Sequence, residues 1–385
     1  MLHPHDIFSP NEPWTIRIVS LAREFRDAGH RVKLAYCPLD IDEEKIHIDL
    51  SGIELTVLSR KTGLKSLLRN IKTIKELSRG ADLIHFQKCF HYVAIPALVC
   101  AWLMDKPLHY DWDDWEEKIW YHSNKPSLHT LIFGNFIKLL ERWLPLLADT
   151  VSVSSHKLRD LCIGFGAEEE RVFKAAVGAD TRQFAPHVSG EGIKARHNLG
   201  ARRVIVYLGQ LHAGQYVKMF IEAANIVLHK YPNAVFLIIG QGHQLDSLRG
   251  LVEKLGVENS VIFTGSVPHD RVPEYIAAAD ICAASFEHNE VTICKSPLKI
   301  VEYMAMGKAI VASNVGEIRW MLGGVGVVVP PGDTHSLAEG IVRLLKDKAL
   351  RDNLGSLARQ RAERTYNWQN SASSLLAAYK KQIAN

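Results

Sequence analysis

The chain has 385 residues and carries 46 Lys and Arg against 42 Asp and Glu, a net charge of +4. At about 150 residues per domain this length suggests two or three domains, and 47% hydrophobic with 23% charged residues exclude a disordered chain. The basic excess is too small to indicate nucleic acid as a partner. Six scattered cysteines without a C-x-x-C pair argue against a disulfide framework or a zinc site. The chain has neither a signal-peptide pattern at its start nor an apolar run long enough to span a membrane, so we expect a cytoplasmic protein.

Short apolar runs alternate with amphipathic stretches along almost the whole chain. Such runs are typical of buried parallel strands, and two series of them predict two doubly wound α/β domains. A full first strand is missing, because Pro4 and Asp6 follow the start at once; either this strand is a stub or it lies upstream. In the first series the expected strands are 31–37, 53–59, 82–86, 107–111, 150–154 and 172–176, and the expected helices include 14–28, 64–77 and 158–163.

Residues 60–79 predict a basic amphipathic helix. Seven Lys and Arg residues face a single acid, Glu76, while apolar residues from Leu64 to Leu77 form one stripe. An anionic membrane surface attracts such a helix, which makes residues 60–79 a candidate for peripheral membrane contact. The alternative is an ordinary domain helix with a solvated basic face.

The stretch 110–117, YDWDDWEE, follows directly on an expected strand. Its carboxylates, Asp113 and Asp114 among them, repel one another unless solvent, cations or sugar hydroxyls separate them. Trp112 and Trp115 offer flat faces of the kind on which sugars stack. A divalent metal ion is conceivable there, and a solvated acidic loop is the plain alternative. The histidines show no metal-ligand spacing, and we predict no metal site.

A polar stretch without clear periodicity, residues 186–202, predicts a linker. We therefore expect a first domain at 1–185, a second domain at 203–367, and a last helix, 368–385, that packs on the first domain. The strands expected in the second domain are 204–208, 234–239, 261–264, 281–284, 309–312 and 325–329.

Two glycine turns follow the first two of these strands. Gly209 opens a loop that includes Gln210 and Gln215 and leads into a helix, an arrangement that directs free backbone N–H groups at a phosphate. A glycine that simply turns the chain is the alternative. Gly240 and Gly242 begin a dinucleotide fingerprint, but Leu245 takes the place of its third glycine, which excludes a nicotinamide dehydrogenase.

The strongest local signal is the segment 295–307, KSPLKIVEYMAMG. Ser296 as N-cap and Pro297 at the first helical position predict a helix start. Lys299 then lies in the first turn, where the helix dipole disfavours a cation unless an anion binds there. Glu302 follows on the same face and can accept hydrogen bonds from vicinal hydroxyls. The pattern favours a diphosphate at Ser296–Lys299 and a ribose at Glu302, with an ordinary surface Lys–Glu pair as the alternative.

Together these segments resemble family 4 glycosyltransferases, over nearly the whole chain. The resemblance implies a GT-B fold, in which two Rossmann-like domains face a central cleft. It also implies retaining transfer of a sugar from a UDP-sugar or GDP-sugar to a glycan or lipid-linked acceptor, with no tightly bound cofactor and no required metal. The segments that carry it are 148–154, 177–181, 206–209, 263–268, 272–280 and, most specifically, 296–313 (SPLKIVEYMAMGKAIVAS).

The resemblance also assigns roles to residues. Glu302 would hold the ribose, while Leu298 and Lys299 would bind the diphosphate. The backbone of Gly265, Ser266 and Val267 would contact the base, and Asp113 or its neighbour Asp114 takes the place of a histidine common in the family. We therefore predict Asp113, Asp114 and Lys299 as catalytic residues.

The sequence departs from the family pattern in several places. Cys294 replaces a common glutamate, Gln210 and Gln215 replace an Arg and a Lys of the phosphate loop, and residues 11–14 replace a glycine pair. Our preferred interpretation is a hexosyltransferase that uses a UDP-sugar in envelope or exopolysaccharide synthesis, at the inner face of the cell membrane. A nucleotide-sugar epimerase of the same fold and a non-catalytic nucleotide-sugar-binding paralogue are the alternatives.

Overall fold

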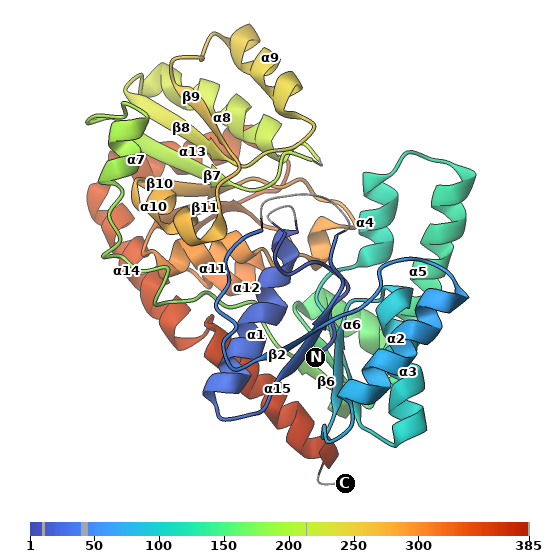
Figure 1. The fold of residues 1–385 in the computed structure, drawn as a ribbon. Helices are drawn as coiled ribbons and strands as arrows, with labels where there is room; N and C mark the ends of the chain where they lie inside the picture. The colour runs from blue at the N-terminus through green and yellow to red at the C-terminus, as the bar shows by residue number, and fades with distance from the viewer. Residues whose placement is uncertain (10–11, 40–44, 213, 384–385) are drawn as a thin grey trace. The chain divides into compact units, whose positions relative to one another are not determined.

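The computed structural model describes residues 1–9, 12–39, 45–212 and 214–383, so part of the 11–14 segment lies outside the described residues. It divides into two units (Figure 1), one of Met1–Val177 with Trp368–Asn385 and one of Gly178–Asn367. The first boundary therefore lies before residue 185, and the expected linker 186–202 belongs to the second unit. This segment contains helix α7 (Glu191–Arg196) and packs tightly, since a Cβ on Gly190 would lie 2.3 Å from the backbone nitrogen of Ala278.

The first unit contains a parallel sheet that residues 1–3 complete. Leu2 N donates to His85 O at 2.8 Å, and His3 N donates to Ala35 O at 2.8 Å, so these residues form a strand stub between β1 and β3. The resulting order, β2-β1-stub-β3-β4-β5-β6, reverses direction at the stub, as in a Rossmann sheet. The strands are β1 (Lys33–Tyr36), β2 (Glu54–Val57), β3 (Ile84–Gln87), β4 (Leu108–Trp112), β5 (Thr150–Val153) and β6 (Val172–Lys174).

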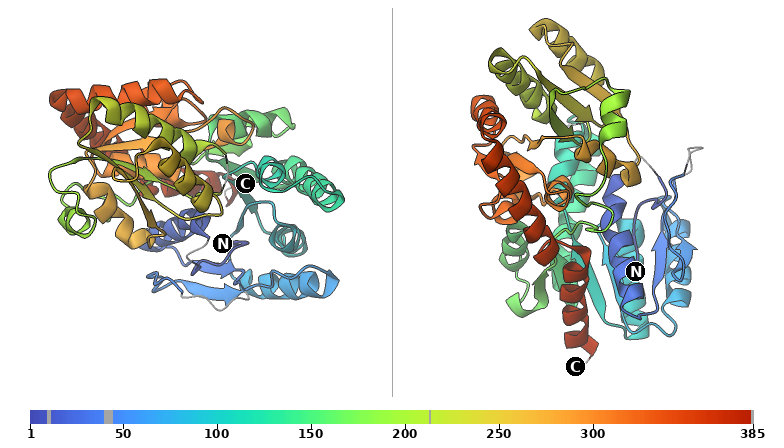
Figure 2. Two further views of the ribbon diagram at one scale, coloured as in Figure 1. Left: turned by 90° about the horizontal axis from the view of Figure 1, so that it is seen from above. Right: turned by 90° about the vertical axis from the view of Figure 1, so that its left-hand side faces the viewer.

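Helices cover both faces of this sheet. Figures 1 and 2 show α1 and α15 on one side and α2, α3 and α5 on the other. Tyr379 of α15 is buried against the sheet, where its hydroxyl lies 2.6 Å from His85 Nδ1. The helices are α1 (Ile16–Asp27), α2 (Leu64–Leu77), α3 (His91–Met104), α4 (Glu116–Ser123), α5 (Leu128–Leu147), α6 (His156–Gly164) and α15 (Trp368–Ile383), with 3-10 turns η1 (Pro13–Thr15) and η2 (Glu169–Arg171).

The second unit is a six-stranded parallel sheet in the order β12-β11-β10-β7-β8-β9. Its strand order also reverses, between β7 and β10, and ligands of such sheets bind outside the carboxyl ends of the strands at this point. Three of its strands, β8, β10 and β11, are buried along their whole length, which explains their continuous apolar sequences. The doubly wound α/β prediction is thus confirmed in both units.

The strands of this unit are β7 (Arg203–Leu208), β8 (Ala234–Ile239), β9 (Val261–Gly265), β10 (Ile281–Ala284), β11 (Ala309–Ser313) and β12 (Val327–Val329). Its helices are α8 (Tyr216–Lys230), α9 (Leu245–Leu255), α10 (Val272–Ala277), α11 (Leu298–Ala305), α12 (Ile318–Leu322), α13 (Thr334–Lys346) and α14 (Lys348–Arg364), with 3-10 turns η3 (His269–Arg271) and η4 (Thr292–Cys294).

Candidate functional site

The carboxyl edge of the second sheet brings the predicted glycines together. Gly240 N donates to Gly265 O at 2.9 Å, and a Cβ on Gly240 would lie only 2.0 Å from Gly209 O. A Cβ on Gly242 would lie 2.3 Å from Leu211 O. Three consecutive loops therefore pack backbone against backbone, which no larger residue permits. Gly209, Gly240 and Gly265 line the carboxyl edge of the second sheet, whereas Gly242 packs against the loop after β7.

Helix α11 presents Lys299 to this edge. The helix is fixed to the end of β7 because Leu208 N donates to the Tyr303 hydroxyl at 2.8 Å. Lys299 Nζ lies 4.3 Å from the ring centroid of Tyr207 and 5.4 Å from that of Phe286. A Cβ on Gly209 would approach the same nitrogen to 2.5 Å. The lysine tip thus lies directly against the glycine of the predicted phosphate loop.

The ammonium group of Lys299 lacks an acidic partner: in the described part of the chain, no carboxylate oxygen lies within 4.0 Å of it. Burial and, to a smaller extent, the charge of Lys295 lower the pKa of Lys299 to about 7, although Glu302 opposes both effects. A desolvated cation without a counter-charge is poorly stabilised, and a bound anion would supply that charge. This arrangement suits a phosphate group.

Glu302, one turn further along α11, is buried with 2% of its surface exposed. Its Oε1 lies 2.6 Å from Nε2 of His269, which begins η3 in the loop after β9. His269 is not among the residues predicted from the sequence, although it lies between two of the segments that carry the family resemblance. The pair connects the loop that starts with Gly265, Ser266 and Val267 to the helix that carries Lys299.

The prediction that Ser296 caps α11 is wrong. Pro297 occupies the cap position in an extended conformation (φ −70°, ψ 119°), so the helix begins at Leu298. Ser296 Oγ is turned instead toward Met321 Sδ, 4.0 Å away. Lys299 remains in the first helical turn, where the backbone N–H groups have no partners within the helix.

The other predicted residues of this site differ in their exposure. Gln210 and Gln215 are exposed on the loop after β7, and Gln215 precedes α8 without capping it through its side chain. Ser266 is exposed, whereas Val267 and Leu298 are half-buried. Cys294, at the position of the common glutamate, is buried.

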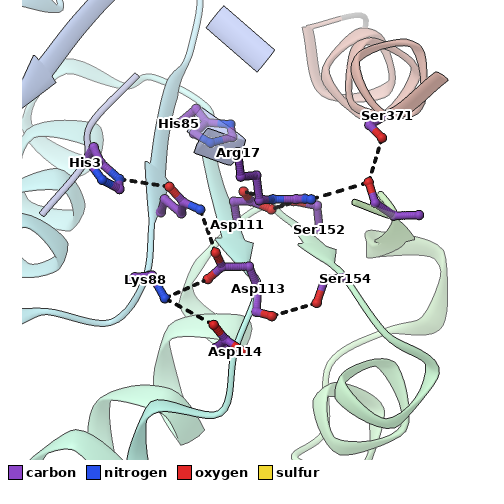
Figure 3. A network of polar contacts seen from close by, with 12 residues as sticks. His3, Arg17, His85, Lys88, Asp111, Asp113, Asp114, Ser152, Ser154 and Ser371 are labelled. Carbon is purple, nitrogen blue, oxygen red and sulfur yellow. Dashed lines mark hydrogen bonds and ion pairs between the residues drawn. The ribbon is translucent and has the colours of Figure 1, made fainter. Parts of the chain in front are cut away.

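The first unit carries a separate polar network at the carboxyl edge of its sheet (Figure 3). Lys88 Nζ lies 3.2 Å from Asp113 Oδ1 and 3.7 Å from Asp114 Oδ2. The same nitrogen lies 2.5 Å from Glu116 Oε1. Gln87 Nε2 donates to Asp113 Oδ2 at 2.7 Å. Asp113 and Asp114 therefore surround an internal ammonium group, and the alternative of a merely solvated acidic loop is wrong.

The electrostatics of this network follow from its burial. Burial raises the pKa of Asp113 to about 7, although the Lys88 ammonium opposes this shift. Burial alone would lower the pKa of Lys88, but the surrounding carboxylates outweigh it and hold that pKa well above its usual value. Deeper in the sheet, Arg17 binds Asp111 through two hydrogen bonds of 2.8 Å and keeps the pKa of Asp111 low despite burial.

Asp113, Asp114 and Glu116 offer oxygens within 4.8 Å of one another, which is close enough to share a metal ion. However, the buried Lys88 already supplies their positive counter-charge, and a divalent cation beside it would be repelled. The residues therefore do not fit a divalent metal while Lys88 is charged.

Comparisons with known proteins match this chain to glycosyltransferases. Residues 202–347 match the family described as "Glycosyl transferases group 1". The alpha-D-kanosaminyltransferase of Streptomyces kanamyceticus is 27% identical over 191 residues, 49% of this chain and 48% of that protein. A GDP-mannose-dependent phosphatidylinositol monomannoside mannosyltransferase of Mycolicibacterium smegmatis is 28% identical over 50% of this chain and 52% of its own length. The chain thus spans about half the length of these curated relatives.

Solved structures match the chain over its whole length. HepE of Anabaena in complex with UDP has a TM-score of 0.71 at 17% identity, with 99% of both chains covered. The sucrose-phosphate synthase of Thermosynechococcus elongatus has a TM-score of 0.75 at 19% identity, with 100% and 99% covered. The fold is therefore GT-B, as predicted. Residues 202–347 match the group 1 glycosyltransferase family, which bears out the resemblance inferred from the sequence for this part of the chain.

Proposed function

We propose that this chain is a glycosyltransferase that moves a sugar from a nucleoside diphosphate donor to a hydroxyl group, with retention of configuration. The observation that carries the proposal is the arrangement on α11, where Lys299 faces Gly209 with no acidic partner among the described residues, and Glu302 lies three residues further on. The diphosphate would bind the ammonium group and the N–H groups of the first turn, and Glu302 would accept the ribose hydroxyls.

We propose a UDP-sugar as the donor. HepE, whose fold this chain shares, is described in complex with UDP, which supports this choice. Because one relative is named as GDP-mannose-dependent, a GDP-sugar is the alternative donor. The base would lie against the backbone of residues 265–267, where Gly265 adopts φ +78° and no atom lies within 4 Å of its Cβ position.

In the proposed reaction the bond between the anomeric carbon and the phosphate oxygen breaks, and a bond from that carbon to the acceptor oxygen forms. The acceptor's proton passes to the leaving phosphate on the same face of the sugar, so no nucleophile of the enzyme is consumed. The chain must supply charge stabilisation and orientation. Lys299 would stabilise the charge on the leaving diphosphate, and Asp113 with Asp114 would act on the acceptor side.

We further propose that the acceptor is a glycan or a lipid-linked sugar of envelope or exopolysaccharide synthesis, handled at the inner face of the cell membrane. No helix of the described residues is both long and apolar enough to cross a bilayer. Contact with the membrane through residues 60–79 is therefore proposed as peripheral.

Incubation with a panel of nucleotide sugars and glycan acceptors tests the activity. We expect release of nucleoside diphosphate that requires both donor and acceptor and does not respond to a chelator. Conversion of the donor without an acceptor would indicate an epimerase instead. Tight nucleotide binding without turnover would indicate a non-catalytic paralogue, an outcome that the uncharged Gln210 and Gln215 on the phosphate loop favour.

A further inference from the structure

Helix α5 exposes its apolar side rather than burying it. Its stripe follows helical spacing along the whole helix, and Leu128 at the start of the stripe is 73% exposed. A stripe of this kind normally faces a core or a partner. Its large exposed members are Leu128, Leu131, Ile132, Leu139, Trp143 and Leu147.

The opposite side of α5 holds the helix in this orientation. Glu141 is buried there and accepts hydrogen bonds from Trp112 Nε1 at 3.0 Å and from the backbone nitrogens of Glu116 and Glu117 at 2.8 and 2.9 Å. The two backbone bonds satisfy the first two N–H groups of α4. Rotating α5 to bury the stripe would break them, so the outward apolar face is built into the unit.

Helices α3 and α2 lie beside α5 and extend this surface. His91 of α3 contacts Phe136 of α5, with ring centroids 5.6 Å apart, and lines a small cavity of about 80 Å³ together with Leu67 of α2. At the end of α3, Trp102 is 81% exposed, and on α2 Leu64 is 72% exposed. We call the outer faces of α2, α3 and α5 the docking surface; Figure 1 shows the three helices on one side of the first sheet.

The docking surface is also strongly basic. In the described part of the chain, no carboxylate oxygen lies within 4.0 Å of the exposed cations of α2, and the exposed Lys138 and Arg142 flank the stripe on α5. A second copy of the chain would bring the same positive charge to this face and be repelled. The exposed cations of α2 are Lys65, Arg69, Lys72 and Lys75.

We propose that the docking surface binds a bilayer of anionic phospholipids, with the apolar stripe of α5 and Trp102 entering the headgroup boundary and α2 lying over the phosphates. Exposed apolar area combined with unpaired basic charge suits such a boundary. This proposal extends the candidate 60–79 helix to a three-helix face and does not depend on the catalytic function.

Vesicle co-sedimentation tests the proposal on the full chain, with phosphatidylcholine vesicles that contain or lack about one-third phosphatidylglycerol. We expect binding to the anionic vesicles and its release by raised salt. Each basic residue near the surface contributes about fivefold in affinity, so the triple variant Lys65→Glu, Arg69→Glu, Lys72→Glu should lose well over tenfold. The variant Leu139→Ser, Trp143→Ser should also lose about tenfold or more, because less apolar area is buried.

Matched controls are Lys254→Glu on α9 and Leu357→Ser on α14, which change one exposed basic residue and one exposed apolar residue outside the docking surface. Both should bind like the parent chain, and all variants should keep its melting temperature. Absence of binding to anionic vesicles would overturn the proposal, as would equal losses in the controls. A dimer in solution that Trp143→Ser dissociates would show that a second copy covers the stripe and would equally refute membrane docking.

Discussion

His269 Nε2 lies 2.6 Å from Glu302 Oε1 and joins the loop after β9 to the helix that carries Lys299. With Nε2 protonated, the imidazole donates to one carboxylate oxygen and fixes the rotation of the carboxyl group. Among the described residues, no hydrogen bond is made to the second oxygen, Oε2. Glu302 is thus oriented by a neighbour with one acceptor atom remaining for ribose hydroxyls.

Removing either member of this pair should weaken nucleotide binding. For Glu302→Ala we expect a loss of about 1–3 kcal/mol in UDP affinity, the range for hydrogen bonds to a charged group. His269→Ala should cause a smaller loss, and His269→Gln should restore part of it because the amide can still donate to Oε1. Titration calorimetry with UDP measures all three. Equal affinities for His269→Ala and the parent chain would show that the pair does not orient Glu302.

Nucleotide affinity should depend on pH through Lys299. The pKa of this lysine is about 7 in the free protein because of burial, and a bound diphosphate favours the charged form and raises that pKa. Above pH 7 the free protein loses the proton that binding requires, so UDP affinity should fall by up to about tenfold per pH unit. Calorimetry in two buffers of different ionisation enthalpy should detect proton uptake on binding.

Lys299→Arg is the matched variant for this test, because the guanidinium group stays protonated over the whole accessible pH range. Its UDP affinity should show little dependence on pH between 7 and 9, whatever its absolute value. Lys299→Ala should lose about 1–3 kcal/mol of affinity at pH 7. A parent chain whose affinity is flat above pH 7 would contradict the role of Lys299 as a titrating phosphate ligand.

A methyl group at Gly209 should displace Lys299 from its place. The added Cβ of Gly209→Ala would lie 2.5 Å from Lys299 Nζ, so the ammonium group must move away from the loop. We expect UDP affinity to fall by about 1–3 kcal/mol, similar to the loss of a charged hydrogen bond. Gly256→Ala is the control, since it also has positive φ (+67°) but no atom within 4 Å of its Cβ. This control should cost about 1 kcal/mol of stability and leave affinity unchanged; a similar loss of affinity in both variants would exclude the steric explanation.

Strands β8 and β10 are predictable from sequence because they are buried on both faces. Ala234–Ile239 and Ile281–Ala284 begin and end where their apolar runs predict. The three-residue stub at Leu2 has no such run, and its place between β1 and β3 depends on hydrogen bonds to residues far along the chain. The segment 186–202 looks polar, yet buried residues such as Ile193 and Leu199 attach it to the second unit.

The site was predictable only where one helix carries it. Lys299 and Glu302 follow from local spacing on α11, which the structure retains even though the helix begins one residue later than predicted. The pairing of Glu302 with His269 connects residues 33 positions apart, and that of Lys88 with Glu116 spans 28. Such contacts depend on strand order, which periodicity does not reveal.

Lys88 should be essential for the stability of the first unit, since it neutralises Asp113, Asp114 and Glu116 from a buried position. Lys88→Met would leave these carboxylates without their counter-charge, and we expect the free energy of unfolding at pH 8 to fall by about 3–5 kcal/mol. Without the ammonium group, repulsion and burial raise the carboxyl pKa values above those of the unfolded chain. The folded variant then binds more protons than the unfolded one, so its deficit should shrink as the pH falls toward 5. Urea unfolding of the parent chain and of Lys88→Met at pH 5 and pH 8 measures this deficit.

The control is Lys138→Met, which removes an exposed lysine 3.8 Å from Glu117. This variant should change the free energy of unfolding by no more than about 0.5 kcal/mol. A deficit for Lys88→Met of the same size at pH 5 and pH 8 would mean that lost packing, rather than uncompensated charge, destabilises the variant.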